Sequence, residues 1–303
     1  MAKKYISGLV SIGFPTYNRA DLLKRAVDSL LGQTYQNIEL IISDNCSSDG
    51  TQKLCEEYPA KDRRVKYHRQ KENIGIIANG IFVLKEARGE YYMWASDDDW
   101  WNPKFIELLK DPLDRNSEYG TAMSSLVREY IDGKWYDELL FAGPNDLTKL
   151  RPEEVFYKMA FSRKPFQCVW WGLHRTEPMQ KFMNRPWVKC ERHDRVMAAE
   201  LALVTRFYTL PDILFKKTMH EIPPNIRHAE TYGSPSETWR HKRYFYFVSK
   251  KIFLSELVPW ERKITFLPAY FKLAVMLIMT KTLLRKFPRQ FQKLKAKLCF
   301  WIP

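Results

Sequence analysis

The sequence predicts an α/β protein: a mostly parallel central sheet flanked by helices, with a basic helical appendage at its C-terminal end. Two observations predict this class. Apolar runs alternate with segments of helical periodicity over the first hundred residues, and excess positive charge is confined to the last sixty. Strands that alternate with helices form parallel sheets covered by those helices. At 303 residues, of which 45% are hydrophobic, the chain is long enough to bury one large core.

The first hundred residues supply four strands and the helices between them. Short apolar runs bounded by turn residues predict the strands, at residues 9–14, 38–43, 65–68 and 90–95. Apolar residues spaced i, i+3, i+4 predict the helices, at residues 22–31, 51–58 and 76–87. Asn102 and Pro103 then suit the N-cap and the first position of a further helix.

The middle of the chain follows less regular patterns. The turn at Asp132-Gly133 predicts a hairpin across residues 121–136. Further helices are predicted at residues 152–161 and 194–204, and further strands at residues 168–173, 206–210 and 213–215.

Each of the first four predicted strands is followed by a polar segment, at residues 15–19, 44–49, 70–75 and 97–99. In parallel sheets the strands end at one edge, where ligands bind, so we expect these segments to form one site. The last segment is Asp97-Asp98-Asp99, whose three carboxylates repel one another unless a positive charge lies between them. Mg²⁺ or Mn²⁺ would supply that charge, and a solvated acidic turn is the alternative.

Several other classes of protein are excluded by missing motifs. The first turn, at residues 14–19, has no G-x-G-x-x-G, and no G-x-x-x-x-G-K-[ST] occurs, so neither a dinucleotide dehydrogenase nor a P-loop NTPase is expected. The glycine-rich opening of sugar nucleotidylyltransferases is absent as well. Asp44 either contacts a nucleotide or caps its own turn. Five cysteines without C-x-x-C spacing predict neither a disulfide framework nor a zinc ribbon, which fits a reducing compartment.

Four segments at the ends of the predicted strands match a known pattern in order and spacing. They are Pro15-Thr16-Tyr17-Asn18-Arg19, Ser43-Asp44-Asn45-Cys46-Ser47-Ser48-Asp49-Gly50-Thr51, Asn73-Ile74-Gly75 and Ser96-Asp97-Asp98-Asp99-Trp100. Together they resemble the family 2 glycosyltransferases of the GT-A fold. The resemblance implies an inverting hexosyltransferase of class EC 2.4 that uses a nucleotide sugar, with UDP as the expected nucleotide.

The resemblance also implies roles for individual residues. The nucleotide-binding residues would be Pro15, Thr16, Tyr17, Arg19, Asp44, Asn73, Gly75 and Asp97. Asp44 would hydrogen-bond the base. The ligands of Mn²⁺ or Mg²⁺ would be Asp98, Asp99 and His220. Many relatives have D-S-D-D where this chain has Ser96 followed by three aspartates, so Asp98 is the expected direct ligand, with Asp97 or Asp99 assisting.

Other positions have competing explanations. Asp194, which precedes a predicted helix, matches the catalytic base of the family or serves as the N-cap of that helix. His220 matches a family histidine near the diphosphate or is an ordinary surface histidine. Trp170 and Trp171 shape the acceptor side, where aromatic rings stack on sugars, or pack in the core.

The C-terminal region carries most of the net charge. The whole chain has a formal charge of +14, and residues 240–303 hold 15 basic residues against two acidic ones, with aromatic side chains among them. Basic, aromatic helices of this kind bind anionic membrane surfaces. A solvated basic face and an RNA-binding stripe are the alternatives, and no RNA-binding motif accompanies the stripe.

We expect a glycosyltransferase domain over residues 1–230, with a nucleotide-binding half (1–110) and an acceptor half (111–230), and a membrane-associating region over 231–303.

These inferences predict an enzyme that is peripheral on the inner, cytoplasmic face of the cell membrane. Its expected partners are a nucleotide-sugar donor, an anionic membrane surface, and a glycan or lipid-linked glycan acceptor, with no nucleic acid. The pathway would be the synthesis of a cell-surface polysaccharide or lipopolysaccharide. The alternative is a catalytically inactive, membrane-bound scaffold, which the serine at position 96 favours and the intact acidic triplet and Asp194 oppose.

Overall fold

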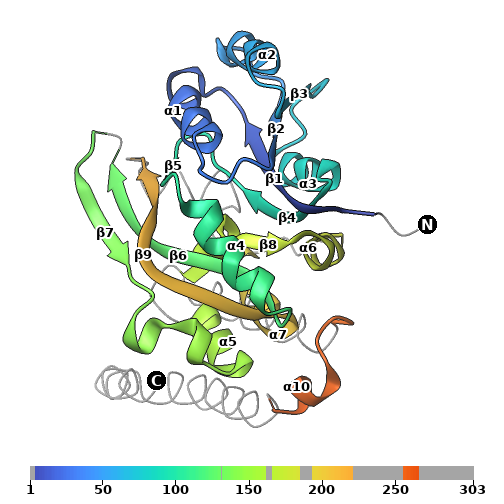
Figure 1. Ribbon diagram of the computed structural model, residues 1–303, viewed down its shortest axis with the longest axis vertical. Coiled ribbons are helices and arrows are strands. Elements are labelled where there is room, and N and C mark those ends of the chain that lie inside the picture. Colours follow the sequence, from blue (N-terminus) through green and yellow to red (C-terminus); the bar gives the residue numbers. More distant parts are fainter. Residues whose placement is uncertain (1–3, 131, 162–165, 185–192, 221–254, 266–303) are drawn as a thin grey trace, which may run out of the picture. The chain divides into compact units, whose positions relative to one another are not determined.

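The computed structural model describes residues 4–130, 132–161, 166–184, 193–220 and 255–265. The chain divides into two compact units, Met1–Val248 and Ser249–Pro303, and most described elements belong to the first (Figure 1). In the second unit the described part contains one short helix, α10 (Trp260–Thr265). The predicted domain boundary at 230/231 and most of the basic C-terminal region lie outside the described residues. Among the helices that are described, none is long and apolar enough to cross a membrane.

The first part of the sheet consists of parallel strands in the order β3-β2-β1-β4. Their bounds are β1 (Ile6–Thr16), β2 (Ile38–Asp44), β3 (Val65–Arg69) and β4 (Gly89–Trp94). Every residue of β2 is buried, as expected for an inner strand of a parallel sheet that helices cover on both faces.

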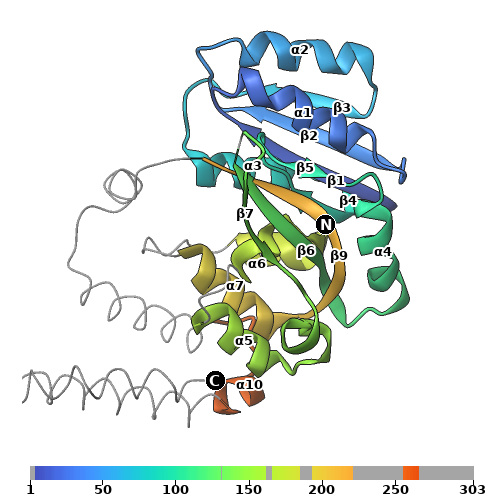
Figure 2. The same cartoon turned by 90° about the vertical axis from the view of Figure 1, so that its left-hand side faces the viewer.

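Three crossover helices connect these strands: α1 (Ala20–Leu31), α2 (Thr51–Lys61) and α3 (Ile76–Glu86). In α1 the side chains of Leu23, Ala26, Val27 and Leu30 have no exposed surface, and their spacing places them on one face of the helix. Burial of that face fixes α1, and with it the loop that leads from β1 into the helix. α1 and α2 lie side by side (Figure 2).

β8 joins the second part of the sheet to the first. It is antiparallel to both β4 and β6, so β4 and β6 run in the same direction. β9 is parallel to β6. The bounds are β5 (Trp100–Trp101), β6 (Tyr119–Tyr130), β7 (Trp135–Leu139), β8 (Leu173–Arg175) and β9 (Arg206–Met219). Strands β1 to β4, β6 and β9 therefore end at one edge of the sheet, called the carboxyl edge below.

The remaining helices belong to the second part of the chain. They are α4 (Phe105–Arg115), α5 (Pro152–Phe161), α6 (Thr176–Met183), α7 (His193–Val204) and the 3₁₀ helices η1 (Gly143–Asn145), η2 (Leu147–Lys149) and η3 (Phe166–Trp171). α5 packs against α7, and α7 also contacts η3, which places the start of α7 near the two tryptophans that end η3.

The structure confirms the four predicted strands of the first half, the three helices between them, the hairpin β6–β7, and helices α5 and α7. The prediction of a strand at residues 168–173 was wrong. The N–H of Gly172 donates to the carbonyl of Val169, so the backbone coils there as η3, and strand pairing begins only at Leu173.

Two other predicted boundaries also differ. Residues 206–215 belong to one strand, β9, because pairing with β6 continues on both sides of Pro211 through a shift in register. The helix predicted from Asn102 and Pro103 begins later, at Phe105. Asn102 forms a turn instead, in which its side chain accepts from the N–H of Lys104 and its carbonyl accepts from the N–H of Phe105.

Candidate active site

Three loops at the carboxyl edge are tied together by asparagine side chains. Asn18 Oδ1 accepts from the N–H of Ser48 at 2.9 Å, which joins the loops after β1 and β2. Asn45 Nδ2 donates to Asn73 Oδ1 at 2.8 Å, and Asn45 Oδ1 accepts from the N–H of Ile74 at 2.9 Å, which joins the loops after β2 and β3. The predicted nucleotide-binding residues of these loops, including Asn73 and Gly75, therefore belong to one fixed rim.

Asp44 lies at the end of β2 and is fully buried. One carboxylate oxygen accepts from the N–H of Ser47 at 2.9 Å, so Asp44 does cap its own turn. The other oxygen accepts from Arg69 Nη1 at 2.6 Å and from the Tyr67 hydroxyl at 3.2 Å. These partners offset the cost of burying the charge. The base-binding role implied for Asp44 stays a prediction.

Asp97 is mostly buried beside the loop that follows β1. Burial raises the pKa of its carboxyl to about 6, and the neighbouring Asp98 adds to that rise. Arg19, whose Nε lies 3.5 Å from Asp97 Oδ1, acts in the opposite direction. The buried hydroxyl of Thr16 also lies close enough to lower this pKa, although not in the geometry of a hydrogen bond. Predicted nucleotide-binding residues from two separate loops thus meet at Asp97.

Asp98 faces His220, and Oδ2 lies 2.6 Å from His220 Nε2. Its Oδ1 is 3.8 Å from Lys217 Nζ. Burial alone would raise the pKa of Asp98, but Lys217, His220 and Arg19 outweigh it and lower the pKa. The backbone is fixed too, because the Asp98 carbonyl accepts from Arg25 Nη2 at 2.7 Å and from the Thr218 hydroxyl.

Asp99 is fully buried and its carboxylate is bound by the protein itself. Lys217 Nζ donates to both oxygens, at 3.1 and 2.9 Å, and the N–H of Thr218 donates to Oδ1 at 2.8 Å. Burial raises the pKa of Asp99 to about 6 even though Lys217 opposes the rise. This arrangement does not favour Asp99 as a metal ligand, because its oxygens already have partners.

Lys217 supplies the positive charge that the acidic triplet requires. Burial lowers its pKa, but Asp99 and Asp98 outweigh burial and raise it, so the ammonium stays charged. The ammonium also lies 4.7 Å from the centre of the Trp171 ring. The sequence analysis did not select Lys217. The alternation of side chains along β9 could have indicated it, because Lys217 shares a face with the buried Phe215.

Two tryptophans of η3 contact the site. Trp171 Nε1 donates at 3.0 Å to the hydroxyl of Ser96, the residue before the acidic triplet. Trp170 Nε1 donates to the carbonyl of Asp194 at 3.2 Å. Both rings also pack against other aromatic rings, Trp171 on Phe215 and Trp170 on Trp94. The two tryptophans therefore pack in the core and also border the candidate site. Their role on the acceptor side stays a prediction.

Asp194 lies inside the first turn of α7, one residue after the helix begins. A carboxylate in this turn is stabilised by the helix dipole, and the helix start at His193 argues against an N-cap role. The described residues place Asp194 beside Trp170, whose neighbour Trp171 contacts Ser96 and Lys217. The role of catalytic base stays a prediction.

Of the predicted metal ligands, Asp98 and His220 lie together, whereas Asp99 is bound by Lys217. The described residues include no group of three His, Cys, Asp or Glu side chains that could hold a metal ion. Mg²⁺ and Mn²⁺ sites that carry substrate phosphates commonly use one or two protein ligands and complete the shell with phosphate and water. Asp98 and His220 bond to each other at 2.6 Å, so a cation bound by both would take the place of the proton between them.

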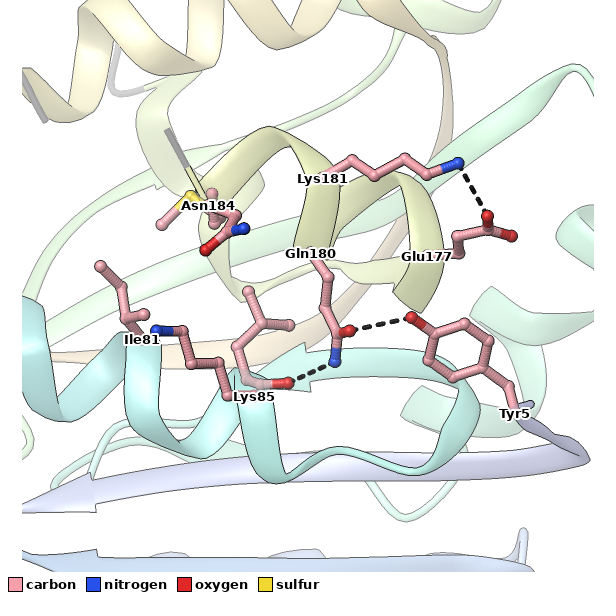
Figure 3. A pocket seen from close by; sticks show the side chains of 9 residues that line it. Tyr5, Ile81, Lys85, Glu177, Gln180, Lys181 and Asn184 are labelled. Atoms are coloured by element: carbon pink, nitrogen blue, oxygen red, sulfur yellow. Dashed lines mark hydrogen bonds and ion pairs between the residues drawn. The ribbon is translucent and has the colours of Figure 1, made fainter. Parts of the chain in front are cut away.

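A cavity between α3, α6 and Tyr5 lies apart from these residues (Figure 3). Tyr5, Gln180, Glu177 and Lys181, four of the polar side chains that line it, already have partners. Gln180 accepts from the Tyr5 hydroxyl at 2.8 Å and donates to the Leu84 carbonyl at 2.6 Å, and Lys181 pairs with Glu177 at 2.7 Å. We therefore assign the chemistry to the carboxyl edge and not to this cavity.

The fold and the acidic carboxyl edge define a nucleotide-sugar transferase of the GT-A type. The profile of the family described as Glycosyl transferase family 2 matches residues 11–190, and the chain belongs to this family. It is 33% identical over 232 residues to the Bacillus subtilis (strain 168) protein named "Putative teichuronic acid biosynthesis glycosyltransferase TuaG", covering 76% of this chain and 86% of that one. It is 27% identical to "Putative glycosyltransferase EpsH" of the same organism, covering 85% and 69%.

A solved structure shares the fold. The S. aureus TarS 1–349 complex with UDP-GlcNAc superimposes with a TM-score of 0.62, covering 87% of this chain and 71% of that one. Sequence identity is 17%, so this likeness concerns the fold.

Proposed function

We propose that this glycosyltransferase moves a hexose from a UDP-sugar, with inversion, to a glycan or lipid-linked glycan acceptor in the synthesis of a cell-surface polysaccharide. The name of the TuaG relative, which refers to teichuronic acid biosynthesis, supports the acceptor class. The complex of TarS with UDP-GlcNAc supports the donor class.

The observation that carries the proposal is the pair Asp98 and His220, 2.6 Å apart. Lys217 lies 3.8 Å from the Asp98 carboxylate, and Arg19 lies 3.5 Å from that of the neighbouring Asp97. A cation held by Asp98 and His220 would stabilise the charge that develops on the leaving nucleoside diphosphate. Arg25 and Thr218 hold the Asp98 backbone in place. The backbone at Asp98 is therefore preorganised, and only the side-chain bond to His220 would change when a cation binds.

Asp194 is the proposed base. It would take the proton from the acceptor hydroxyl as that oxygen attacks the anomeric carbon from the side opposite the leaving group. The Trp170 indole, which donates to the Asp194 carbonyl, holds the first turn of α7 against η3. Trp170 and Trp171 thereby link the base to the loop that carries the acidic triplet.

Nucleotide binding tests the donor site. Calorimetry with UDP, GDP and dTDP, each with Mn²⁺ and with EDTA, should give binding of UDP that requires the metal. Asp98→Asn should weaken that binding at least about tenfold, because it removes one charged ligand. The matched control is Asp111→Asn, at an exposed acid on α4 that pairs with Arg115, and this variant should bind as the parent does. No binding of any nucleotide by the folded protein, or equal binding by Asp98→Asn, would contradict the proposal.

Residues 231–303 are proposed to hold the enzyme on the cytoplasmic face of an anionic membrane. The support is the charge of residues 240–303, 15 basic against two acidic residues, since each basic residue near such a surface contributes about 1 kcal/mol. The full chain should sediment with phosphatidylglycerol vesicles at low salt and not with phosphatidylcholine vesicles. A chain that ends at residue 239 should lose this binding, and equal binding by that shorter chain would contradict the proposal.

A further inference from the structure

A row of charged side chains runs across three strands toward the acidic triplet. Asp137 of β7 pairs in register with Arg128 of β6, and Arg128 pairs in register with Lys217 of β9. Residues directly opposite each other in a sheet point to the same face. The Arg128 guanidinium binds the Asp137 carboxylate with two nitrogens, and Lys217 binds Asp99. One face of the sheet therefore carries Lys217, Arg128 and Asp137 side by side, and this row joins Asp99 to the hairpin β6–β7.

A bulge at this hairpin directs a tyrosine onto the same face. Arg128 pairs with Asp137 and Glu129 pairs with Trp135, so Tyr136 is the extra residue of β7. Bulges of this kind redirect a side chain and are frequent beside active sites. The Tyr136 ring meets the Tyr130 ring edge to face at 5.5 Å, and the Arg128 guanidinium lies 4.8 Å from the centre of the Tyr136 ring. We call Arg128, Tyr130 and Tyr136 the tyrosine ledge.

The tyrosine ledge adjoins the proposed metal ligands. Tyr130 pairs in register with Met219, the residue before His220, and paired residues of neighbouring strands are about 5 Å apart. Tyr136 remains 42% exposed. Within the described part of the chain, neither tyrosine hydroxyl has a hydrogen-bond partner. An accessible aromatic surface with two available hydroxyls thus lies at the carboxyl edge, next to the residue that faces Asp98.

We propose that the tyrosine ledge is a binding subsite for a sugar ring of the acceptor glycan, an inference that rests on the proposed function. Sugar rings combine an apolar C–H face, which packs on aromatic rings, with hydroxyls, which bond to phenols and to charged groups. The charge of Arg128 is balanced by Asp137, so the ledge suits a hydroxyl-bearing sugar and offers no unpaired cation to a phosphate.

The same strands provide a matched control for simple packing. At the opposite end of β6, Tyr119 and Tyr208 form a similar edge-to-face pair at 5.3 Å, with the Arg206 guanidinium 5.7 Å from the Tyr119 ring. Eleven residues of strand separate Tyr119 from Tyr130, a distance of roughly 36 Å at about 3.3 Å per residue. This second cluster resembles the ledge but lies far from the carboxyl edge, so it should bind no acceptor.

Saturation-transfer NMR on the full chain, with UDP and Mn²⁺ present, tests the subsite. The probes are the methyl glycosides of glucose, galactose, N-acetylglucosamine, N-acetylgalactosamine and glucuronic acid. The parent should bind at least one of them, and Tyr136→Ala should weaken that binding about twofold to twelvefold, the range expected for one stacking contact. Tyr136→Phe should keep most of the affinity because the ring remains. Tyr208→Ala should bind as the parent does, and all three variants should bind UDP unchanged.

Three results would overturn the inference. One is parent protein that binds UDP but none of the glycosides. Another is glycoside binding that Tyr136→Ala leaves unchanged, or that Tyr208→Ala weakens equally. The third is a parent protein that binds no UDP, which would refute the proposed function and the subsite with it. UDP binding measured in the same samples thus separates failure of the subsite alone from failure of the function.

Discussion

Protonation of His174 is expected to set part of the pH dependence of stability. His174 lies in β8 with no exposed surface, and its Nδ1 is 3.0 Å from the Thr121 hydroxyl. Burial lowers the pKa of the imidazole to about 3, and the nearby Trp170 backbone offsets this only in part, although it is not in hydrogen-bond geometry with the ring. The folded protein therefore keeps His174 neutral at any pH at which it is normally studied.

The sign and size of the effect follow from the two pKa values. Below pH 6.5 the unfolded chain binds a proton at this imidazole, and the folded chain does not until about pH 3. Stability is therefore fully present above pH 6.5 and is lost as the pH falls, by about 1.4 kcal/mol per pH unit. Between pH 7.5 and pH 5.0 the loss from this one group is about 2 kcal/mol.

Urea unfolding of the parent and of His174→Leu, at several values between pH 7.5 and pH 5.0, measures this contribution. His174→Leu should be less stable at pH 7.5, since it leaves Thr121 without its partner, but its stability should fall about 2 kcal/mol less toward pH 5.0. Thr121→Val is the control, because it removes the same hydrogen bond and keeps the imidazole, so its slope should match the parent. Parallel pH curves for the parent and His174→Leu would refute the reasoning.

Two further predictions concern a buried ion pair and the packing of a glycine. Lys217→Met should cost about 3–5 kcal/mol in urea unfolding because it leaves the buried Asp99 carboxylate without a counter-charge, whereas Lys216→Met, at a side chain that is 44% exposed, should cost under about 1 kcal/mol. Adding Asp99→Asn to Lys217→Met should recover more than half of the loss, and no recovery would argue against the pairing. Gly172→Ala should cost about 1–3 kcal/mol, since a Cβ there would lie 2.5 Å from a carbonyl oxygen of β6. Gly80→Ala on α3, where a Cβ has room, should be neutral or stabilising, and equal losses in the two glycine variants would contradict this.

The order of elements in the first half of the chain could be predicted because its signals are local. The apolar positions of α1 repeat at helical spacing, and the strands end in polar segments that bind one another across the carboxyl edge. The second half was harder to predict. The close approach of Gly172 to β6 and the continuity of β9 past Pro211 depend on neighbours that are distant in the sequence, which no local pattern encodes.

In the site too, local features could be predicted from the sequence and contacts between distant residues could not. The sequence located Asp97, Asp98 and Asp99 at a strand end and indicated that they require a positive charge. It did not identify the source of that charge. Lys217 lies more than a hundred residues away, and the register of β9 brings its ammonium to Asp99.

The class of fold, the family and the loops of the carboxyl edge could be predicted from the sequence because periodicity and strand-end motifs are properties of neighbouring residues. The contacts of Asp98 with His220, of Asp99 with Lys217 and of Tyr136 with Tyr130 became known from the fold. The physical reason is that each of these contacts depends on strand register or on a bulge. If the register shifted by one residue, or if the bulge were lost, these side chains would turn to the opposite face of the sheet.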